Sequence, residues 1–342
     1  MPITLKDIAE RAQVSQATVS IAMGSAGRIS DETRTRIRRI ADEMGYRPNM
    51  LVQGIQKGRT HTIGVLMQLS GDAFDAGLFT GVHNALADVG CVPIVLMPVA
   101  SVSVLDQIHM LIDRRVDGLV LRPTKEAIWE RHIDEAIDRD VPVVAIDLEP
   151  QAETPHVDFV GTDDIGGARL AAERLLNEGH RNLAVITTGG FPDTMYFRRE
   201  GFEARVQEAP EASCVSVSVP WSLEITGYDA AVEVLALRPR PTAIFVTMDV
   251  IASGVYRAAR EAGLRIPDDL SVVGFADNPI ATVLDPPLST MRQRPLEIGG
   301  RAARLLLERI DEGAAHGSRE RILVAPELIE RGSVKAAPDA DR

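Results

Sequence analysis

The sequence predicts an α/β protein with a small three-helix head, a hinge helix and a two-lobed core of doubly wound parallel sheets. Residues 4–23 have the pattern of two short capped helices separated by a tight turn. From His61 onward, apolar runs of about five to seven residues alternate with amphipathic helical stretches, which is typical of parallel sheets covered on both faces. At 342 residues the chain is long enough for two or three well-buried domains.

The first two predicted helices have the pattern of a helix-turn-helix. Thr4, with Asp7 three residues later, caps the first helix, whose apolar face is formed by Leu5, Ile8, Ala9 and Ala12. Ser15 caps the second helix, and Val19 and Ala22 pack back on the first. The other residues of the second helix face outward, where they would enter a DNA major groove: Gln16, Ala17, Thr18, Ser20 and Ile21. An ordinary helical hairpin is the alternative interpretation.

A third helix completes the head. It opens at Ser30, closes at Gly45 and places its apolar residues on one inner face: Ile37, Ile40, Ala41 and Met44. We expect some of its arginines to be solvated or paired with Glu43 instead of bound to DNA. Residues 50–56 then form a short hinge helix that contains Gly54. Such a helix is too short to be stable alone in water, so we expect it to order only when DNA and a partner chain hold it.

The charge is divided unequally along the chain. Residues 1–60 carry a net charge of +4, whereas the whole chain carries −12. A basic head on an acidic body is expected when the head touches DNA phosphates and the body does not. A solvated basic face would give the same count.

Composition also bounds the location and the chemistry. No apolar run approaches the roughly 20 residues that span a membrane, and the chain begins with a polar capped helix instead of a signal peptide, so we expect a cytoplasmic protein. Cys91 and Cys214 lie far apart in apolar runs and are expected to be small buried hydrophobes. The histidines lack metal-ligand spacing, and no phosphate-binding, dinucleotide or nucleophile-elbow motif occurs. We therefore expect no metal, no cofactor and no enzyme activity.

The core is predicted from its apolar runs. Eight runs are candidate strands: 62–67, 92–97, 118–121, 141–146, 183–187, 215–219, 243–246 and 270–274. Gly161-Thr162-Asp163 separates them into two sets of four, which predicts two lobes. Ligands of such sheets bind beyond the carboxyl ends of the strands, and a cleft between lobes is the default site.

Three segments resemble the lac repressor family (LacI/GalR type). TLKDIAERAQVSQATVS, RISDETRTRIRRIADEMGYRPN and KGRTHTIGVL match its N-terminal head, hinge and first core strand. The resemblance implies a periplasmic-binding-protein-like core whose chain crosses between the lobes near residues 160, 290 and 324. The expected parts are a DNA-binding head at 1–48, a hinge at 49–60, an N-terminal core lobe at 61–159 plus 291–323, a C-terminal core lobe at 160–290 plus 324–332, and a disordered tail at 333–342.

The resemblance implies DNA contacts in the head and hinge. Gln16 and Ala17 occupy base-reading positions, where Gln16 would bond an adenine edge and Ala17 would touch a thymine methyl. Ile21 stands where an arginine is usual, so a guanine contact is not expected there. Ile55 matches a leucine that wedges into the minor groove, or else packs only on its partner hinge. The remaining implied contacts are Thr4, Ser15, Thr18, Ser20, Arg28, Tyr46, Asn49, Val52 and Gln53.

The resemblance also implies ligand contacts at the strand ends. Asp147 matches an aspartate that bonds a sugar hydroxyl, Arg198 matches the pocket arginine, and Trp221 matches an aromatic residue that stacks on a sugar ring. A local ion pair, a surface charge and a core position are the respective alternatives. Met248-Asp249 stands where the family usually has Asn-Asp, and Ala276 stands where it usually has an aspartate, so the pocket has lost an amide and a carboxylate. Two further cleft positions, Phe74 and Arg122, complete the expected set.

The charges of this set bear on the ligand. Two arginines with fewer acids favour a ligand that carries a carboxylate or phosphate, because a guanidinium matches such groups bidentately. Alternatively, Arg122 pairs with a neighbouring acid and the ligand is neutral. The expected effector is therefore a sugar, a sugar acid or a related metabolite.

The expected function is a ligand-responsive transcriptional regulator. In its simplest form it represses a carbohydrate or small organic acid operon and binds a pseudo-palindromic operator as a homodimer. A corepressed or activating regulator is the alternative. A solute receptor on the same core would need a signal peptide and no helix-turn-helix. The C-terminal segment has no leucine heptad, so we expect a dimer and not a coiled-coil tetramer.

Overall fold

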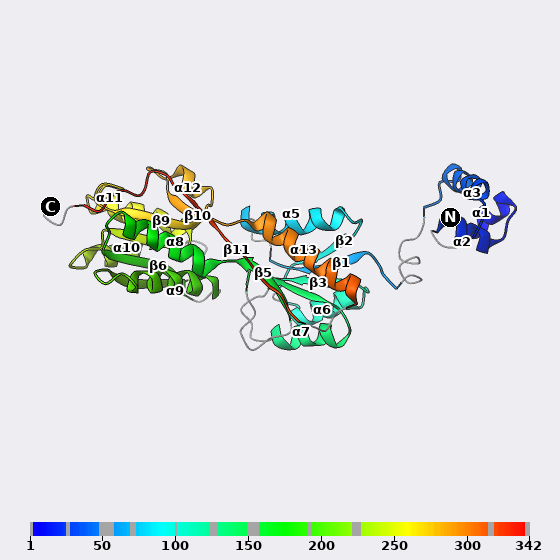
Figure 1. Ribbon diagram of the computed structural model, residues 1–342, viewed down its shortest axis with the longest axis horizontal. Coiled ribbons are helices and arrows are strands. Elements are labelled where there is room, and N and C mark those ends of the chain that lie inside the picture. The colour runs from blue at the N-terminus through cyan, green and yellow to red at the C-terminus, as the bar shows by residue number, and fades with distance from the viewer. Residues whose placement is uncertain are drawn as a thin grey trace. The chain divides into compact units, whose positions relative to one another are not determined.

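The computed structural model describes residues 3–24, 28–47, 58–68, 73–99, 101–122, 129–148, 157–189, 193–220, 227–313 and 318–338. The chain forms two units, Met1–Thr60 and His61–Arg342 (Figure 1). Within the described residues, no helix combines the length and the apolarity needed to cross a membrane.

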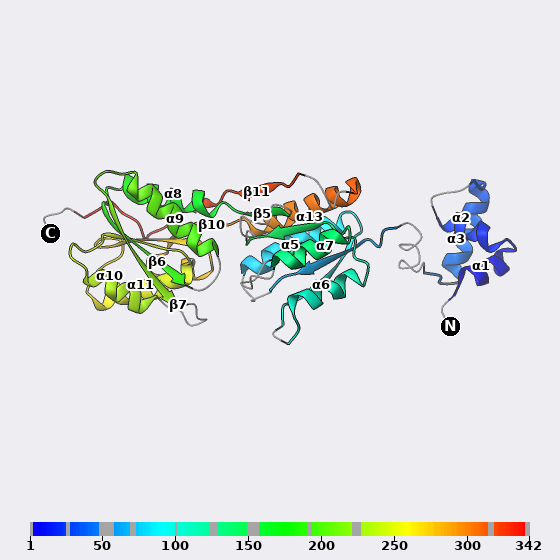
Figure 2. The ribbon, with the colours of Figure 1, turned by 90° about the horizontal axis from the view of Figure 1, so that it is seen from below.

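The head consists of three short helices, α1 (Leu5–Ala12), α2 (Gln16–Met23) and α3 (Asp31–Glu43), which pack together (Figure 2). The predicted caps are confirmed, because Thr4 and Asp7 form a reciprocal capping box on α1 and Ser15 caps α2. A small apolar core lies between the helices and contains Ile8, Ala9, Ala12, Val19, Ala22, Ile37 and Ala41.

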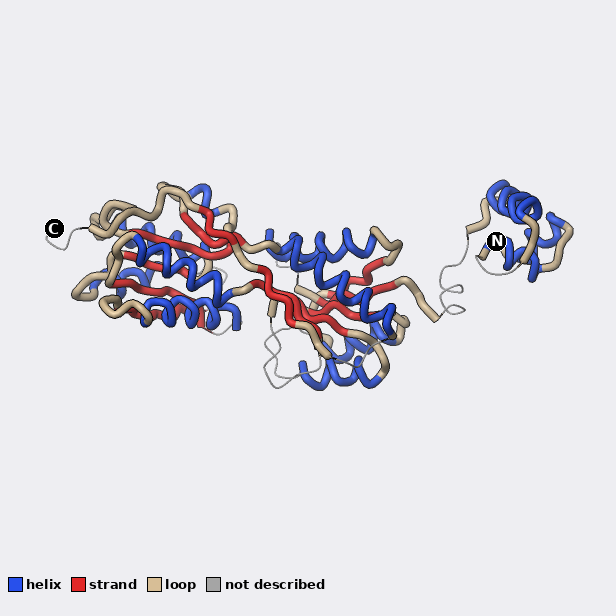
Figure 3. The backbone as a smooth tube through the Cα atoms, in the orientation of Figure 1, coloured by secondary structure: helices blue, strands red, loops and turns tan. Residues whose placement is uncertain are grey.

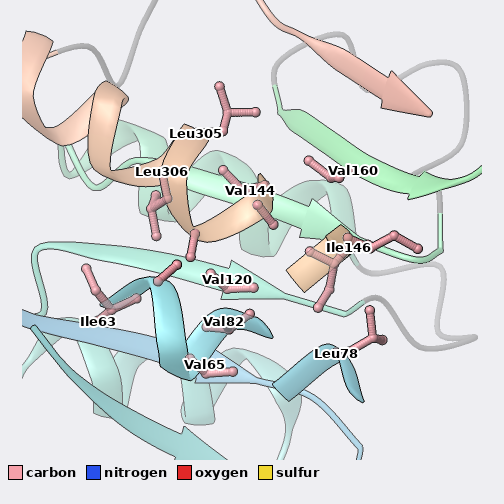
Figure 4. Packing of buried hydrophobic residues seen from close by; sticks show 14 of the residues in the cluster. Ile63, Val65, Leu78, Val82, Val120, Val144, Ile146, Val160, Leu305 and Leu306 are labelled. Atoms are coloured by element: carbon pink, nitrogen blue, oxygen red, sulfur yellow. The ribbon is translucent and has the colours of Figure 1, made fainter. Parts of the chain in front are cut away.

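The first lobe of the core is built on a six-stranded parallel sheet with the order β11-β5-β4-β3-β1-β2. Its strands are β1 (Thr62–Leu66), β2 (Val92–Leu96), β3 (Gly118–Leu121), β4 (Val143–Ile146), β5 (Asp158–Thr162) and β11 (Arg321–Val324). Its helices are α5 (Ala73–Ala87), α6 (Val104–Ile112), α7 (Trp129–Asp138) and α13 (Pro295–Glu312). Alternate strand residues face α5 and α13 on one side, where Val65, Val144 and Leu306 pack (Figure 4), and α6 and α7 on the other.

The second lobe repeats this plan with the order β12-β10-β9-β8-β6-β7. Its strands are β6 (Asn182–Gly189), β7 (Ser213–Pro220), β8 (Ala243–Val246), β9 (Ser271–Ala276), β10 (Ser289–Arg292) and β12 (Glu327–Ile329), of which β12 is antiparallel to β10. Its helices are α8 (Asp164–Asn177), α9 (Asp193–Gln207), α10 (Tyr228–Ala236), α11 (Asp249–Glu261) and α12 (Ile280–Val283). The predicted doubly wound α/β architecture is confirmed.

All eight candidate strands are present, and four further strands, β5, β10, β11 and β12, were not predicted (strands in red, Figure 3). Each of the four borders a passage of the chain from one lobe to the other. The chain leaves the first sheet after Thr162, returns after Arg292, and leaves again after Val324. Each of these strands has at most five residues and includes a charged side chain, so none has the longer apolar run that identified the others.

The predicted disordered tail at 333–342 is wrong for its first residues. Ser333 is fully buried, accepts a hydrogen bond from the Ser289 amide and donates one to the Val272 carbonyl. The Lys335 carbonyl lies 3.0 Å from Nε2 of the buried His180, and the Ala337 amide donates to the Glu178 carbonyl. The segment is therefore held on the second lobe by backbone hydrogen bonds, which its polar sequence does not reveal.

Candidate DNA-binding head and ligand cleft

The outer surface of α2 is the candidate DNA-reading surface. Gln16, Ala17 and Ser20 are exposed on it, whereas Ile21 is half-buried. The hydroxyl groups of Ser15 and Thr18 lie 2.8 Å apart, and the Thr18 amide donates to Ser15. The cap therefore fixes the amino end of α2. The exposed side chains of the helix, those of Gln16, Ala17 and Ser20, are free of the head core.

The other predicted DNA contacts have different environments. Hydrogen bonds from Thr4 hold the pKa of the exposed Asp7 carboxyl below its ordinary value, so Thr4 already serves the capping box. Arg28 is exposed, and Tyr46 packs at the edge of the head core. Arg39 pairs with Glu43 at 2.7 Å, as expected for an arginine of α3. The predicted contacts Asn49, Val52, Gln53 and Ile55 lie outside the described residues.

In the first lobe, Arg122 joins two buried carboxylates. It follows β3, and its Nε lies 2.8 Å from Oδ2 of Asp147, which follows β4. Its Nη1 pairs with Asp75 in the first turn of α5. Asp75 and Asp147 are only 2% and 5% exposed. Burial alone would lower the pKa of Arg122, but the charges of Asp147 and Asp75 outweigh it and raise that pKa.

This geometry decides between the two interpretations of Arg122. The guanidinium is already paired within the chain, and the cluster contains two carboxylates for one arginine. The premise of an uncompensated arginine that needs an anionic ligand is therefore wrong. Phe74 lies beside the cluster, with its ring centre 5.7 Å from the guanidinium carbon. Asp75 was missed because its side chain reaches Arg122 only through the packing of α5 on the sheet.

In the second lobe, Arg198 is also compensated. It is 4% exposed, its Nε donates to Asp164 at 2.7 Å, and its Nη1 donates to the Thr247 carbonyl at 2.9 Å. The guanidinium carbon lies 4.0 Å from the ring centre of Phe275. Burial raises the pKa of Asp164 to about 6 although Arg198 opposes the shift. Arg198 is thus fixed at the sheet edge by a carboxylate, a carbonyl and a ring.

Asp249, which follows β8, is hydrogen-bonded to a residue of β10 and to one that follows β9. Asp249 is fully buried and accepts hydrogen bonds from Thr290 Oγ1 at 2.6 Å and from the Asn278 amide at 2.7 Å. Met248 precedes it and packs at the edge of the core. Ala276 has a φ of 118°, which is strained for alanine. Trp221 lies outside the described residues.

A cavity of about 220 Å³ lies where the two lobes of the core meet. Its lining includes Asp147 and Phe159 from the first lobe, Asp164 and Phe197 from the second, and Thr162 and Asp163 at the passage between them. Of the predicted ligand contacts that the structure describes, only Asp147 is among the lining residues. Phe159 and Thr162 were missed because they belong to β5, a strand that the sequence did not reveal. The lining combines carboxylates, aromatic rings and the cationic Arg321, so it offers both hydrogen bond acceptors and a donor to a polar ligand.

We expect Arg122→Met to lower the free energy of unfolding by about 3 kcal/mol, because it leaves two buried carboxylates without a cation. Combining it with Asp75→Asn and Asp147→Asn should recover most of the loss. Arg139→Met is the matched control, since it removes an exposed pair with Glu135 and should cost at most about 0.5 kcal/mol. Urea unfolding measures all three, and equal losses in Arg122→Met and Arg139→Met would contradict the prediction.

Asp249 should make stability depend on pH. Burial raises the pKa of Asp249 from 3.8 to about 6, so the protonated side chain favours the folded state. Its contribution to the free energy of unfolding is complete below the pKa of the unfolded chain and is lost as the pH rises through about 6. Relative to Asp249→Asn, the parent should lose up to about 3 kcal/mol of unfolding free energy between about pH 4 and 7. Asp229→Asn, at an exposed position of α10, should leave the parent's pH profile unchanged. Parallel profiles for the parent and Asp249→Asn would refute this assignment.

Comparison with known proteins matches both parts of the chain. Residues 4–49 match the model of bacterial regulatory proteins, lacI family, and residues 172–334 match a periplasmic binding protein-like domain. The ribose operon repressor of Escherichia coli strain K12 is 30% identical over 338 residues, which cover 96% of this chain and 99% of that protein.

Solved structures agree. A lac repressor dimer bound to operator and the anti-inducer ONPF has a TM-score of 0.80 at 25% identity, covering 98% of this chain and 100% of that one. A LacI family transcriptional regulator from Enterococcus faecalis V583 with bound ribose has a TM-score of 0.66 at 30% identity, covering 80% and 99%. The similarity to the ribose operon repressor extends over nearly the whole length of both proteins. The chain therefore belongs to the lacI family of bacterial regulatory proteins.

Proposed function

We propose that the chain is a cytoplasmic, ligand-responsive transcriptional repressor that binds a pseudo-palindromic operator as a homodimer. The observation that carries the proposal is the exposed, capped α2 on a small helical head, joined to a core with a polar cavity where its two lobes meet. The operator-bound dimer and the ribose operon repressor among its relatives support the same function. A corepressed or activating regulator is the second form of this proposal.

Base recognition is assigned to the amino end of α2. Gln16 presents an amide that matches an adenine edge, and the Ala17 methyl group matches a thymine methyl. Ile21 offers no hydrogen bond donor from its side chain, so guanine is not selected at the base pair that this position faces. Phosphate contacts from the other predicted residues of the head, among them the exposed Arg28, set its register on the duplex.

The effector is assigned to the cavity, and we infer that it is an uncharged polyhydroxyl compound. Asp147, Asp163 and Asp164 line the cavity, and both Arg122 and Arg198 are already paired with carboxylates. Carboxylate oxygens accept hydrogen bonds from sugar hydroxyls, while an added anion would meet three lining carboxylates against one lining arginine, Arg321. The bound ribose in the Enterococcus faecalis relative is consistent with this class.

Selection from a random duplex pool tests DNA recognition. The parent should recover a pseudo-palindromic site, and Ile21→Arg should acquire a guanine preference at one symmetric base pair, worth about 1–3 kcal/mol of discrimination. That shift identifies the pair that position 21 faces. A guanine preference of the parent at the same pair would refute the assignment of Ile21, and recovery of no common site would refute the proposed function.

Thermal shift with ribose and ribonate, extended to other sugars and their acids, tests the charge of the effector. Neutral sugars should raise the melting temperature as their concentration exceeds Kd, while the matched acids should not. Asp147→Asn should weaken binding of the neutral ligand, because it replaces one acceptor oxygen of the carboxylate by an amide nitrogen. Asp229→Asn is the control, at an exposed position that is not among the lining residues. Stabilisation by acids alone would overturn the inference.

A further inference from the structure

Two arginines of α3 hold the carboxyl end of α2. Arg34 Nη1 lies 3.0 Å from the Ile21 carbonyl oxygen and 2.9 Å from that of Gly24. Arg38 Nε lies 3.0 Å from the Ala22 carbonyl oxygen. The three carbonyls belong to the last turn and the C-cap of α2, which are groups without intrahelical partners.

The residues of α2 and its C-cap provide few of the interactions that usually stabilise the carboxyl end of a helix. The helix has eight residues, with no basic residue in its last turn, and its C-cap Gly24 is extended at φ −90° and ψ 179°. The Gly24 amide returns a single hydrogen bond to the helix, to the Ser20 carbonyl. By contrast, α1 ends at Gln13 in the left-handed conformation, whose amide bonds back to Ala9 and Glu10. An isolated helix of this length is marginal in water. The end of α2 therefore depends on donors from another helix.

We propose that Arg34 and Arg38 are positioning residues that fix the orientation of the DNA-reading helix and do not act as phosphate contacts. Their guanidinium groups lie at the negative end of the α2 dipole. The base-reading side chains of Gln16 and Ala17 lie at the opposite end of the helix, which is the end that contacts base edges in a helix-turn-helix. Two of the positive charges of the head are thus used to order its reading helix.

The DNA consequence of this inference rests on the proposed function, whereas the ordering of α2 does not. The test therefore has two readouts on the full-length chain. Backbone amide exchange over residues 16–24 reports the order of α2. Affinity for the duplex that the parent selects, and for a random-sequence duplex of equal length, is measured as a function of salt. The variants are Arg34→Ala, Arg38→Ala and Arg34→Lys, and the charge-matched control is Arg39→Ala, which removes only the exposed pair with Glu43.

In Arg34→Ala and Arg38→Ala, exchange should accelerate in α2 but not in α1 or α3. Affinity for the selected duplex should fall on the order of tenfold, which is the loss of about one charged hydrogen bond. The slope of log affinity against log salt should stay at the parent value, because no phosphate contact is lost. Arg34→Lys should retain part of the affinity, since an ammonium reaches fewer carbonyls than a guanidinium. Arg39→Ala should leave α2 exchange unchanged.

A salt slope reduced by about one, with unchanged exchange, would make these arginines phosphate contacts and overturn the proposal. Unchanged exchange together with unchanged affinity would overturn it as well. If Arg34→Ala unfolds the whole head, Arg38→Ala is the deciding variant, because it removes a single hydrogen bond. Amide exchange that becomes faster throughout the head in Arg38→Ala, or that does not become faster in any part of it, would then count against the proposal. If the parent selects no duplex, the proposed function fails, while the exchange of α2 still tests the ordering role.

Discussion

A guanidinium that is largely shielded from water keeps its charge at any ordinary pH, so the fold must supply acceptors for it. This constraint acts at both ends of the first sheet. At the carboxyl ends of β3 and β4, Arg122 is held by Asp75 and Asp147. At the amino end of β5, Arg309 of α13 donates two hydrogen bonds of 3.0 Å to the fully buried Asp158. These bonds raise the pKa of Arg309. The arginines thereby fix α5 and α13 to particular strands.

The same constraint shapes the cleft. Pairs of this kind contribute little net stability, because desolvation offsets most of the attraction, but they define the position of the groups that they join. Arg122 sets the orientation of Asp147, and Arg198 sets that of Asp164. Both carboxylates line the cavity. The hydrogen bond acceptors that meet the proposed effector are therefore already oriented before binding, which lowers the entropy cost of ligand capture.

The parts of this structure that depend on local sequence could be predicted, and the parts that depend on distant partners could not. Thr4 and Ser15 cap helices through residues three positions away, so their roles were readable. β3 is buried throughout and is an uninterrupted apolar run. By contrast, β5 begins with Asp158, whose burial depends on partners far along the chain: Arg309, Arg319 and the Glu320 amide.

Ser333 and Asp75 follow the same rule. Ser333 belongs to a polar segment that looks solvated in the sequence, yet its hydroxyl and those of Ser289 and Ser271 connect the segment to β9 and β10. Asp75 follows Phe74, which was expected in the cleft, but its pairing with Arg122 depends on how α5 packs. In each case a polar residue is buried because a partner remote in the sequence satisfies it, and no local pattern encodes that partner.

The passages between the lobes link the cavity to the arrangement of the two lobes. An effector alters an equilibrium between lobe arrangements only if it binds them with different affinities. Thr162 and Asp163 line the cavity and also form the passage from β5 to α8. The Thr162 hydroxyl accepts a hydrogen bond of 2.9 Å from Gln293, the residue that follows β10, so two passages are tied together by buried side chains. The affinity of a ligand that contacts Thr162 therefore depends on the geometry of both passages. The proposed response to the effector can thus arise from contacts within the cavity.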